Sequence, residues 1–230
     1  MAIIKLAIFD VAGTTAQDGG TVLKAFQIAM TKIGFKEDSY EYVNGSKHVQ
    51  ATMGQRKIDV FRHILGGNEM LAQDAHSIFV DSYIQLVQSG EITEFPGVSE
   101  MFSELNKHGI GVALTTGFPE AILKSVIKNL DWENLINVHV ASDQVNAGRP
   151  SPDLNMKCLS LYNSKYVTQI LPQEVAVVGD TDSDMKAGLA MGANLIIGVT
   201  SGSMSEEVLV ASGATNILPF ATDLLTLVNY

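Results

Sequence analysis

Polar residues at the ends of apolar runs are the part of this sequence that could do chemistry. Asp10 directly follows the apolar run 3–9, and Asp180 follows the run 174–178 with one glycine between. Short, nearly continuous apolar runs are typical of strands buried on both faces of a parallel sheet. In open α/β sheets, ligands bind beyond the carboxyl ends of the strands. We therefore expect both carboxylates to lie at one reactive edge of a sheet.

Three further residues are placed so that they could join this edge. Thr116 follows the apolar run 110–114, Arg149 lies in a short loop before a proline, and Asp184 lies one helical turn after Asp180. Gathered carboxylates repel one another unless a cation is bound, and ligation by oxygen alone suits Mg²⁺. The guanidinium of Arg149 is suited to phosphate oxygens. These residue types favour covalent catalysis, in which the carboxylate of Asp10 attacks phosphorus and water then hydrolyses the resulting aspartyl-phosphate.

Each of these residues also has an ordinary structural explanation. An aspartate at a strand end is commonly a turn former or a helix cap. Thr116 followed by Gly117 marks a turn, and Asp180 with Asp184 fits an Asx turn that caps a helix. Their order on successive β–α units is what favours a shared site.

The elements that must position these residues predict an α/β fold with an insertion. The chain has 230 residues, 46% apolar and 17% charged, which suits one large domain or a core with an insertion. Alternating strands and helices after residue 95 predict a Rossmann-like three-layer core with a parallel sheet. Residues 17–94 contain helix patterns and no strand pattern. We therefore predict a core formed by residues 1–16 and 95–230, with an all-helical cap inserted at 17–94.

The periodicity and turn residues give approximate bounds for each element. Strands are expected at 3–9, 110–114, 137–140, 174–178 and 194–199. Helices are expected at 21–33, 52–65, 70–87, 99–107, 119–129, 152–161 and 183–191, with two short helices at the end of the chain. The helix at 52–65 is expected to begin with the capping-box spacing of Thr52 and Gln55.

Composition excludes several classes of function. The formal net charge of −10 argues against non-specific binding to nucleic acid or to an anionic membrane. Cys158 is the only cysteine, so an internal disulfide and a thiolate metal cluster are excluded, and we expect it to be an inert core thiol. No apolar run is long enough to span a bilayer, and no signal-peptide pattern occurs at the start. We expect a cytoplasmic protein.

Taken together, the spacing Asp-x-x-x-Thr, a strand ending in Thr, a basic residue before Pro and Gly-Asp-x-x-x-Asp resembles the haloacid dehalogenase (HAD) superfamily. The resemblance covers essentially the whole chain, with a cap of the C1 type. It implies that Asp10 is the nucleophile and that Mg²⁺ is the cofactor. The implied magnesium ligands are Asp10, Asp180 and the backbone carbonyl of Ala12, with Asp184 in support. The implied phosphate-binding residues are Thr116, Gly117 and Arg149.

Ala12 departs from the pattern of the phosphatases in this superfamily. They carry a second aspartate two residues after the nucleophile, where it protonates the leaving oxygen. An alanine cannot transfer a proton, and general acid catalysis contributes roughly 10²–10⁴ in rate. A reaction whose leaving group needs no such acid is therefore favoured.

Lys57 offers such a reaction. If residues 53–65 are helical, its side of the helix is shared by Met53, Val60, Phe61 and Ile64. Apolar neighbours lower the pKa of an amine and free its lone pair, so that it can form an imine with a carbonyl substrate. A protonated imine can accept the carbanion that is left when a C–P bond breaks. The structural alternative is a lysine whose stem covers apolar surface while its ammonium reaches water.

Two segments resemble the phosphonatase-like branch of the superfamily, in which alanine replaces the acid and a cap lysine forms the imine. They are residues 10–15 and 53–59, and Gly148-Arg149-Pro150 and residues 179–186 are also similar. The resemblance implies that Met53 and Gly54 line the substrate pocket. The chain departs from it at residues 18–20 and at Val60, where phosphonatases carry a histidine thought to help proton transfer. His48, His63 and His76 lie in the cap and could replace that histidine, although we expect each to be a surface group.

Three hypotheses follow. The leading one is a Mg²⁺-dependent hydrolase that cleaves a small phosphonate such as phosphonoacetaldehyde through Asp10 and Lys57. The alternative is a phosphomonoesterase of the phosphoglycolate phosphatase type, acting on a small phosphorylated metabolite. The third is a non-catalytic phosphoryl-binding protein. The resemblance also implies a homodimer formed through the cap.

Overall fold

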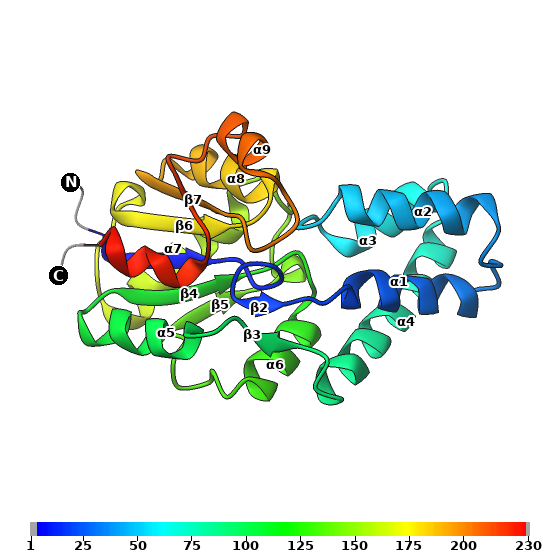
Figure 1. Cartoon of the computed structure of the whole chain (residues 1–230), viewed down its shortest axis with the longest axis horizontal. Coiled ribbons are helices and arrows are strands. Elements are labelled where there is room, and N and C mark those ends of the chain that lie inside the picture. The colour runs from blue at the N-terminus through cyan, green and yellow to red at the C-terminus, as the bar shows by residue number, and fades with distance from the viewer. Residues whose placement is uncertain (1–3, 229–230) are drawn as a thin grey trace.

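The computed structural model describes residues 4–228 (Figure 1). Within these residues, a six-stranded sheet with all-parallel neighbours forms the centre of the core. Its strands, in spatial order, are β5 (Val138–Val140), β4 (Gly111–Thr115), β1 (Leu6–Phe9), β6 (Val175–Gly179), β7 (Leu195–Val199) and β8 (Asn216–Leu218). The predicted α/β core with a parallel sheet is confirmed.

Alternate residues of the central strand pack into two separate apolar cores, because successive side chains of a strand point to opposite faces. Leu6 and Ile8 pack in one cluster with residues of α7 (Asp153–Tyr166), including the buried Cys158. Ala7 and Phe9 pack in the other cluster, which includes α5 (Val98–Lys107). The remaining core helices are α6 (Glu120–Asn129), α8 (Asp182–Met191) and α9 (Glu206–Ala211). Helices on both faces of the sheet make the three predicted layers.

The register of the sheet brings the predicted strand ends together. Phe9 is level with Leu114 of β4 on one side and with Val178 of β6 on the other. The residues that follow these three positions therefore leave the sheet at the same edge. Asp10 and Asp180 are thereby placed side by side although they are far apart in sequence.

Helices α1–α4 form a group beside the core, and we refer to them as the cap (Figure 1). They are α1 (Thr21–Lys32), α2 (Tyr40–Ala51), α3 (Lys57–Ile64) and α4 (Glu69–Gln88). The connections between core and cap include a two-stranded antiparallel ladder of β2 (Ala16–Gln17) and β3 (Thr93–Glu94). The prediction that residues 17–94 contain no strand is therefore wrong at both ends of that segment.

The predicted helix at 52–65 begins later than expected, at Lys57. Residues 52–56 form a turn instead, and Gly54 within it has φ +80°, which the glycine tolerates because it has no Cβ. A Cβ on Gly54 would lie 2.7 Å from Oγ1 of Thr181, so the cap backbone approaches the core closely here. The capping-box spacing predicted a helix where this contact requires a turn. Met53 consequently lies outside the helix that carries Lys57.

Helix α7 continues to Tyr166, beyond the predicted end at residue 161. The end of the chain holds two short helices as predicted, α9 and the 3₁₀ helix η3 (Ala221–Thr226), but strand β8 lies between them and was not predicted. A strand of three residues is too short for its hydrophobic period to be read from sequence. Across the described residues, no helix combines the length and apolar character that crossing a membrane requires.

Candidate active site

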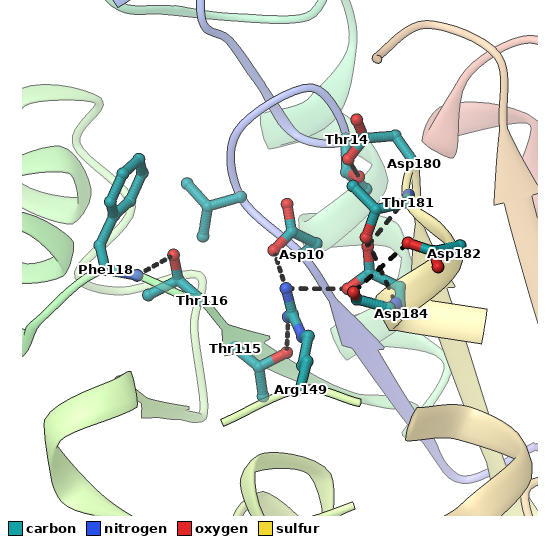
Figure 2. A network of polar contacts seen from close by, with 12 residues as sticks. Asp10, Thr14, Thr115, Thr116, Phe118, Arg149, Asp180, Thr181, Asp182 and Asp184 are labelled. Atoms are coloured by element: carbon teal, nitrogen blue, oxygen red, sulfur yellow. Dashed lines mark hydrogen bonds and ion pairs between the residues drawn. The ribbon is translucent and has the colours of Figure 1, made fainter. Parts of the chain in front are cut away.

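Asp10 lies just beyond β1 and is buried together with Arg149 (Figure 2). Nη1 of Arg149 lies 2.5 Å from Oδ1 of Asp10 and 2.8 Å from Oδ1 of Asp184. Nη2 donates a hydrogen bond of 2.6 Å to Oγ1 of Thr115. The guanidinium thus joins the ends of two strands and the first turn of α8, and it holds Asp10 in a fixed orientation.

Asp180 follows β6 and is held by hydroxyl and amide donors. Oγ1 of Thr14 donates to its Oδ1 at 3.1 Å, and the N–H and Oγ of Ser203 donate to its Oδ2 at 2.8 and 2.9 Å. A Cβ at Gly13 or Gly202 would lie 2.6 or 2.1 Å from Oδ2 of the same carboxylate. Glycine at both positions lets the backbone enclose Asp180, which lies 1% exposed.

Asp184 connects the first turn of α8 to Arg149. Its Oδ2 accepts hydrogen bonds from the N–H and Oγ1 of Thr181, at 3.1 and 2.5 Å, which form a capping box. Its Oδ1 faces the guanidinium. Asp184 therefore has both roles that the sequence left open. It caps the start of α8, and its other oxygen faces the site.

Asp10, Asp180 and Asp184 each offer a carboxylate oxygen, and these atoms lie within 4.8 Å of one another. Burial raises the pKa of Asp10 well above its usual value, and the charges of Asp184 and Asp180 add to that rise against the lowering effect of Arg149. Burial, followed by the charge of Asp184, raises the pKa of Asp180 to about 6. A divalent cation would relieve this repulsion, and a donor set made only of oxygen suits Mg²⁺. The residues present therefore fit a magnesium site.

Thr116 and Gly117 follow β4 and face the cap. Oγ1 of Thr116 accepts a hydrogen bond of 3.1 Å from the N–H of Phe118. A Cβ on Gly117 would lie 2.6 Å from the carbonyl oxygen of Gly54 and 2.5 Å from that of Gln55. Gly117 therefore lets the turn of the cap pack directly on the backbone of the core.

Arg56 fastens the same turn to the core. Its guanidinium donates hydrogen bonds of 3.1 Å to the carbonyl oxygens of Val145 and Asn146. We call residues 53–56 the docking turn, because they carry the contacts with Gly117 and with this loop. The docking turn fixes the position of Lys57, which follows it directly.

Lys57 is the first residue of α3 and lies 4% exposed. Among the described residues, its Nζ has no hydrogen bond or ion pair, and it lies 5.8 Å from the centre of the Phe118 ring. Burial lowers the pKa of Lys57 to about 8, although the carboxylates of Asp18 and Asp10 partly oppose the shift. The expectation of an amine among apolar neighbours agrees with this environment. The alternative of a lysine that reaches water does not.

Two adjoining cavities border these residues. The smaller, of about 20 Å³, is lined by Asp10, Lys57 and Thr116, among others. The larger, of about 320 Å³, is lined by Asp180 and by residues of the β2–α1 connection. Both are lined by Ala12 and Met53, which therefore stand at their shared boundary. The smaller cavity has room for about one water molecule, so a substrate that reaches Lys57 must displace the docking turn or the Met53 side chain.

The candidate site also contains residues that the sequence reasoning did not single out. They are Thr115, Thr181, Ser203 and Asp18. Ser203 follows the end of β7, so the rule applied to the other strand ends could have found it. Residues 18–20 stand out in the sequence only as a departure from the phosphonatase-like pattern, since no local pattern relates Asp18 to Lys57.

The cap histidines lie away from the two adjoining cavities. His48 and His63 stack with ring centres 4.3 Å apart and line a separate cavity on the cap. His76 lies edge-on to Phe61 at 6.4 Å. Val60, at the position of the expected histidine, is buried in the apolar core. None of the three histidines therefore takes the place of the missing one in this arrangement.

Cys158 is buried in α7. Burial raises the pKa of its thiol strongly. A thiol that stays protonated is a poor nucleophile, as expected for an inert core residue.

The site and the fold together are typical of one class of protein. The shared features are the strand-end aspartates, the basic residue before proline and the parallel sheet. Residues 7–197 match the family model described as haloacid dehalogenase-like hydrolase. The chain belongs to this family, and it is an enzyme of the HAD type.

Comparison with individual proteins shows relatives of two kinds within this family. The chain is 29% identical over 215 residues to phosphonoacetaldehyde hydrolase of Latilactobacillus sakei, a match that covers 88% of this chain and 78% of that protein. It is 26% identical over 205 residues to phosphoglycolate phosphatase of Pseudomonas putida, covering 86% and 70%. The fold is similar to the crystal structure of a phosphonoacetaldehyde hydrolase-like protein from Oleispira antarctica, with a TM-score of 0.80, 21% identity and coverage of 97% and 91%.

Proposed function

We propose that this enzyme hydrolyses the C–P bond of a small phosphonate that carries an aldehyde or ketone, such as phosphonoacetaldehyde. The observation that carries the proposal is the environment of Lys57. Its buried ammonium has no hydrogen-bond partner among the described residues, and it lines the same small cavity as Asp10. An unpaired buried ammonium is destabilising, and its lowered pKa makes the free amine accessible near neutral pH.

In the proposed reaction, the amine of Lys57 attacks the carbonyl carbon of the substrate. Loss of water gives a protonated imine. A carboxylate oxygen of Asp10 then attacks phosphorus, and the electron pair of the C–P bond moves into the imine to give a neutral enamine. Protonation of its carbon and hydrolysis release acetaldehyde from Lys57, and a second water molecule releases phosphate from Asp10.

The remaining residues of the site hold charge and position. Arg149 and Thr116 would bind the phosphonate oxygens, and Gly117 would let the substrate approach the backbone. Asp10, Asp180 and the backbone carbonyl of Ala12 would hold Mg²⁺, with Asp184 orienting Arg149. When bound, Mg²⁺ supplies positive charge that offsets the repulsion between a carboxylate nucleophile and a phosphonate. Because the electron pair leaves toward the imine, no acid is needed at Ala12.

The second candidate is a phosphatase that acts on a small ester such as phosphoglycolate. The match to the P. putida phosphatase favours it. This reaction would use Asp10 in the same way, but its leaving oxygen needs a proton from water or from a cap residue. Lys57 would then bind an anionic substrate by charge alone, and arginine could replace it.

The test compares phosphate release from phosphonoacetaldehyde and from phosphoglycolate, with and without Mg²⁺. Sodium borohydride added with phosphonoacetaldehyde is expected to inactivate the enzyme and to add the mass of an ethyl-derived group to Lys57 alone. The Lys57→Arg variant is expected to lose phosphonate cleavage. Full turnover with an unmodified Lys57 would contradict the imine, and fast ester hydrolysis by Lys57→Arg would favour the phosphatase.

Two further proposals concern cofactor and assembly. Removal of divalent cations with a chelator is expected to abolish turnover, and added Mg²⁺ is expected to restore it. A homodimer formed through the cap remains a prediction, which light scattering of the purified protein would check.

A further inference from the structure

Asp18 is a partly buried carboxylate beside the site that the mechanism above does not use. It lies in the connection between β2 and α1. Its Oδ1 accepts a hydrogen bond of 3.2 Å from the N–H of Val22 and one of 3.3 Å from the hydroxyl of Tyr83. Tyr83 comes from α4 and is itself 1% exposed. Two elements of the cap therefore fix the direction of this side chain.

Asp18 and Lys57 line two adjoining cavities of the candidate site. Asp18 lines the larger cavity, Lys57 lines the smaller one, and Met53 borders both. Among the described residues, no ion pair joins the carboxylate of Asp18 to the ammonium of Lys57. The ring centres of Tyr83 and Phe118 lie 4.6 Å apart, and Nζ of Lys57 lies 5.8 Å from the centre of the Phe118 ring, so Tyr83 and Phe118 connect the surroundings of Asp18 with those of Lys57.

The charges around Lys57 single out Asp18. Burial lowers the pKa of Lys57, and the carboxylate of Asp18, followed by those of Asp10 and Asp180, opposes that shift, while the charge of Arg149 adds to it. The other two carboxylates face Arg149 or the hydroxyls of the core, as described above. Asp18 itself accepts its hydrogen bond from Tyr83, and burial raises the pKa of Asp18 above its usual value.

We propose that Asp18, held by Tyr83, is the general acid and base that exchanges protons with Lys57 and the substrate oxygen while the imine forms. This inference rests on the imine mechanism proposed above and assigns it a residue. Tyr83 is a positioning residue, because it acts through Asp18.

The proton transfers balance as follows. The carboxylate of Asp18 takes a proton from the ammonium of Lys57, which frees the lone pair that attacks the carbonyl carbon. As the carbonyl π pair moves to oxygen, the proton on the new N–C adduct passes to that oxygen and gives a neutral carbinolamine. The protonated Asp18 then donates its proton to the hydroxyl, the C–O bond breaks and water leaves. The products are a protonated imine and an ionised Asp18, so the proton taken from Lys57 leaves in the water.

A structural role for Asp18 is the competing explanation, because its carboxylate also accepts a hydrogen bond from the first turn of α1. The Asp18→Asn variant separates the two. The amide oxygen of asparagine keeps the acceptor for Val22 but cannot exchange a proton at neutral pH. Asp143→Asn is a matched control, since Asp143 is exposed and accepts a hydrogen bond of 3.0 Å from the N–H of Glu120 at the start of α6.

The experiment measures the rate at which Lys57 gains mass with phosphonoacetaldehyde and sodium cyanoborohydride, from pH 6 to 9. Loss of a general acid–base group is expected to slow trapping in Asp18→Asn by about 10²–10³-fold. Asp18→Glu is expected to recover part of the rate, and Asp143→Asn to equal the wild type. Tyr83→Phe removes the hydroxyl that holds the Asp18 carboxylate but keeps the carboxylate itself. This variant is expected to slow trapping by about tenfold or less.

The pH profile distinguishes proton exchange from a structural role. In the wild type, the reactive state carries one proton, which is held by either Asp18 or Lys57. This proton is lost above pH 8, so the rate of trapping is expected to fall there. In Asp18→Asn it is expected to rise through the same range, because only the free amine then matters. A slow variant with the wild-type profile, or a variant as fast as the wild type, would overturn the role of Asp18 alone. A wild-type enzyme that is never trapped would overturn the imine and this inference with it.

Discussion

In the core, the guanidinium of Arg149 lies between Asp10 and Asp184, whereas in the cap the ammonium of Lys57 lies beside Phe118 without a hydrogen bond among the described residues. In the core, Asp10 and Asp184 are buried and both pair directly with the guanidinium of Arg149. The cap charge is equally buried and is matched only at a distance, by Asp18 and Asp10.

This difference indicates what each half of the site is for. A buried charge that is paired and hydrogen-bonded keeps one geometry, which suits a nucleophile that must be aligned with phosphorus. A buried ammonium without a partner is unfavourable, so it gives up its proton more readily. The core half is therefore built to hold charge in place, and the cap half is built to change its charge.

The largest effect is expected when the nucleophile in the core is removed. Asp10→Asn keeps the size of the side chain and removes the nucleophile, so turnover of any phosphonate or phosphate substrate is expected to fall by about 10⁴-fold or more. Steady-state phosphate release measures the loss. Asp182→Asn is the control, because Asp182 lies at the start of α8, paired with Lys186 at its surface, and its variant is expected to keep wild-type turnover. Retained turnover in Asp10→Asn would contradict covalent catalysis.

The second prediction concerns Gly117→Ala, which is expected to move Lys57 away from Asp10 without removing a charged group. The Cβ of Gly117→Ala would lie within about 2.5 Å of backbone carbonyl oxygens in the docking turn, which cannot move aside as a side chain can. The turn, and with it Lys57, is expected to shift away from Asp10. Turnover is expected to fall by about 10–100-fold, since small displacements of a reacting group have effects of this size.

Gly148→Ala is the graded control for this change. Its Cβ would meet the Cβ of Arg56 at 3.1 Å, a longer contact than the one at Gly117 that a much smaller shift relieves. A loss of less than tenfold is expected, measured by the same phosphate assay. Equal losses in the two variants would mean that the docking turn does not depend on close backbone contact.

Regular patterns allowed most of the core to be predicted from sequence. Strand ends in a parallel sheet meet at one edge, so three apolar runs predict that Asp10, Thr116 and Asp180 lie together. The residue type of Arg149 predicts its role with phosphate oxygens, and the family resemblance added the role of Ala12. The same logic would have reached Ser203, which follows the end of β7.

The docking turn could not be predicted in this way. Thr52 and Gln55 have the spacing of a helix start, and only the contact between Gly54 and Thr181 shows why the chain turns there instead. That contact joins residues far apart in sequence, so no local pattern records it. Asp18 was missed for the same reason, because its partners Tyr83 and Lys57 lie on two other helices of the cap.

The smallest expected effect is on the stability of the protein when Lys57 of the cap is replaced. The pKa of Lys57 is about 8 in the folded protein, below the value of 10.5 expected for an exposed lysine. Between these two values the unfolded chain binds more protons than the folded one, so this lysine makes the free energy of unfolding rise with pH across that window. Below it, the buried ammonium destabilises the fold. Lys57→Met removes that penalty, and we expect the free energy of unfolding at pH 7 to increase by about 1–3 kcal/mol while phosphonate cleavage is lost.

Urea unfolding of the wild type and Lys57→Met at pH 7 and pH 10 measures this difference. The advantage of the variant is expected to shrink toward pH 10, where the wild-type lysine is neutral in the folded protein. Lys24→Met is the control, because Lys24 is exposed and paired with Glu91 at 2.7 Å, and a surface pair contributes about 1 kcal/mol or less. A Lys57→Met variant that is less stable than the wild type at pH 7 would mean that the ammonium is compensated after all. The contrast between a paired Arg149 in the core and an unpaired Lys57 in the cap would then be lost, and with it the reason for the lowered pKa on which the imine depends.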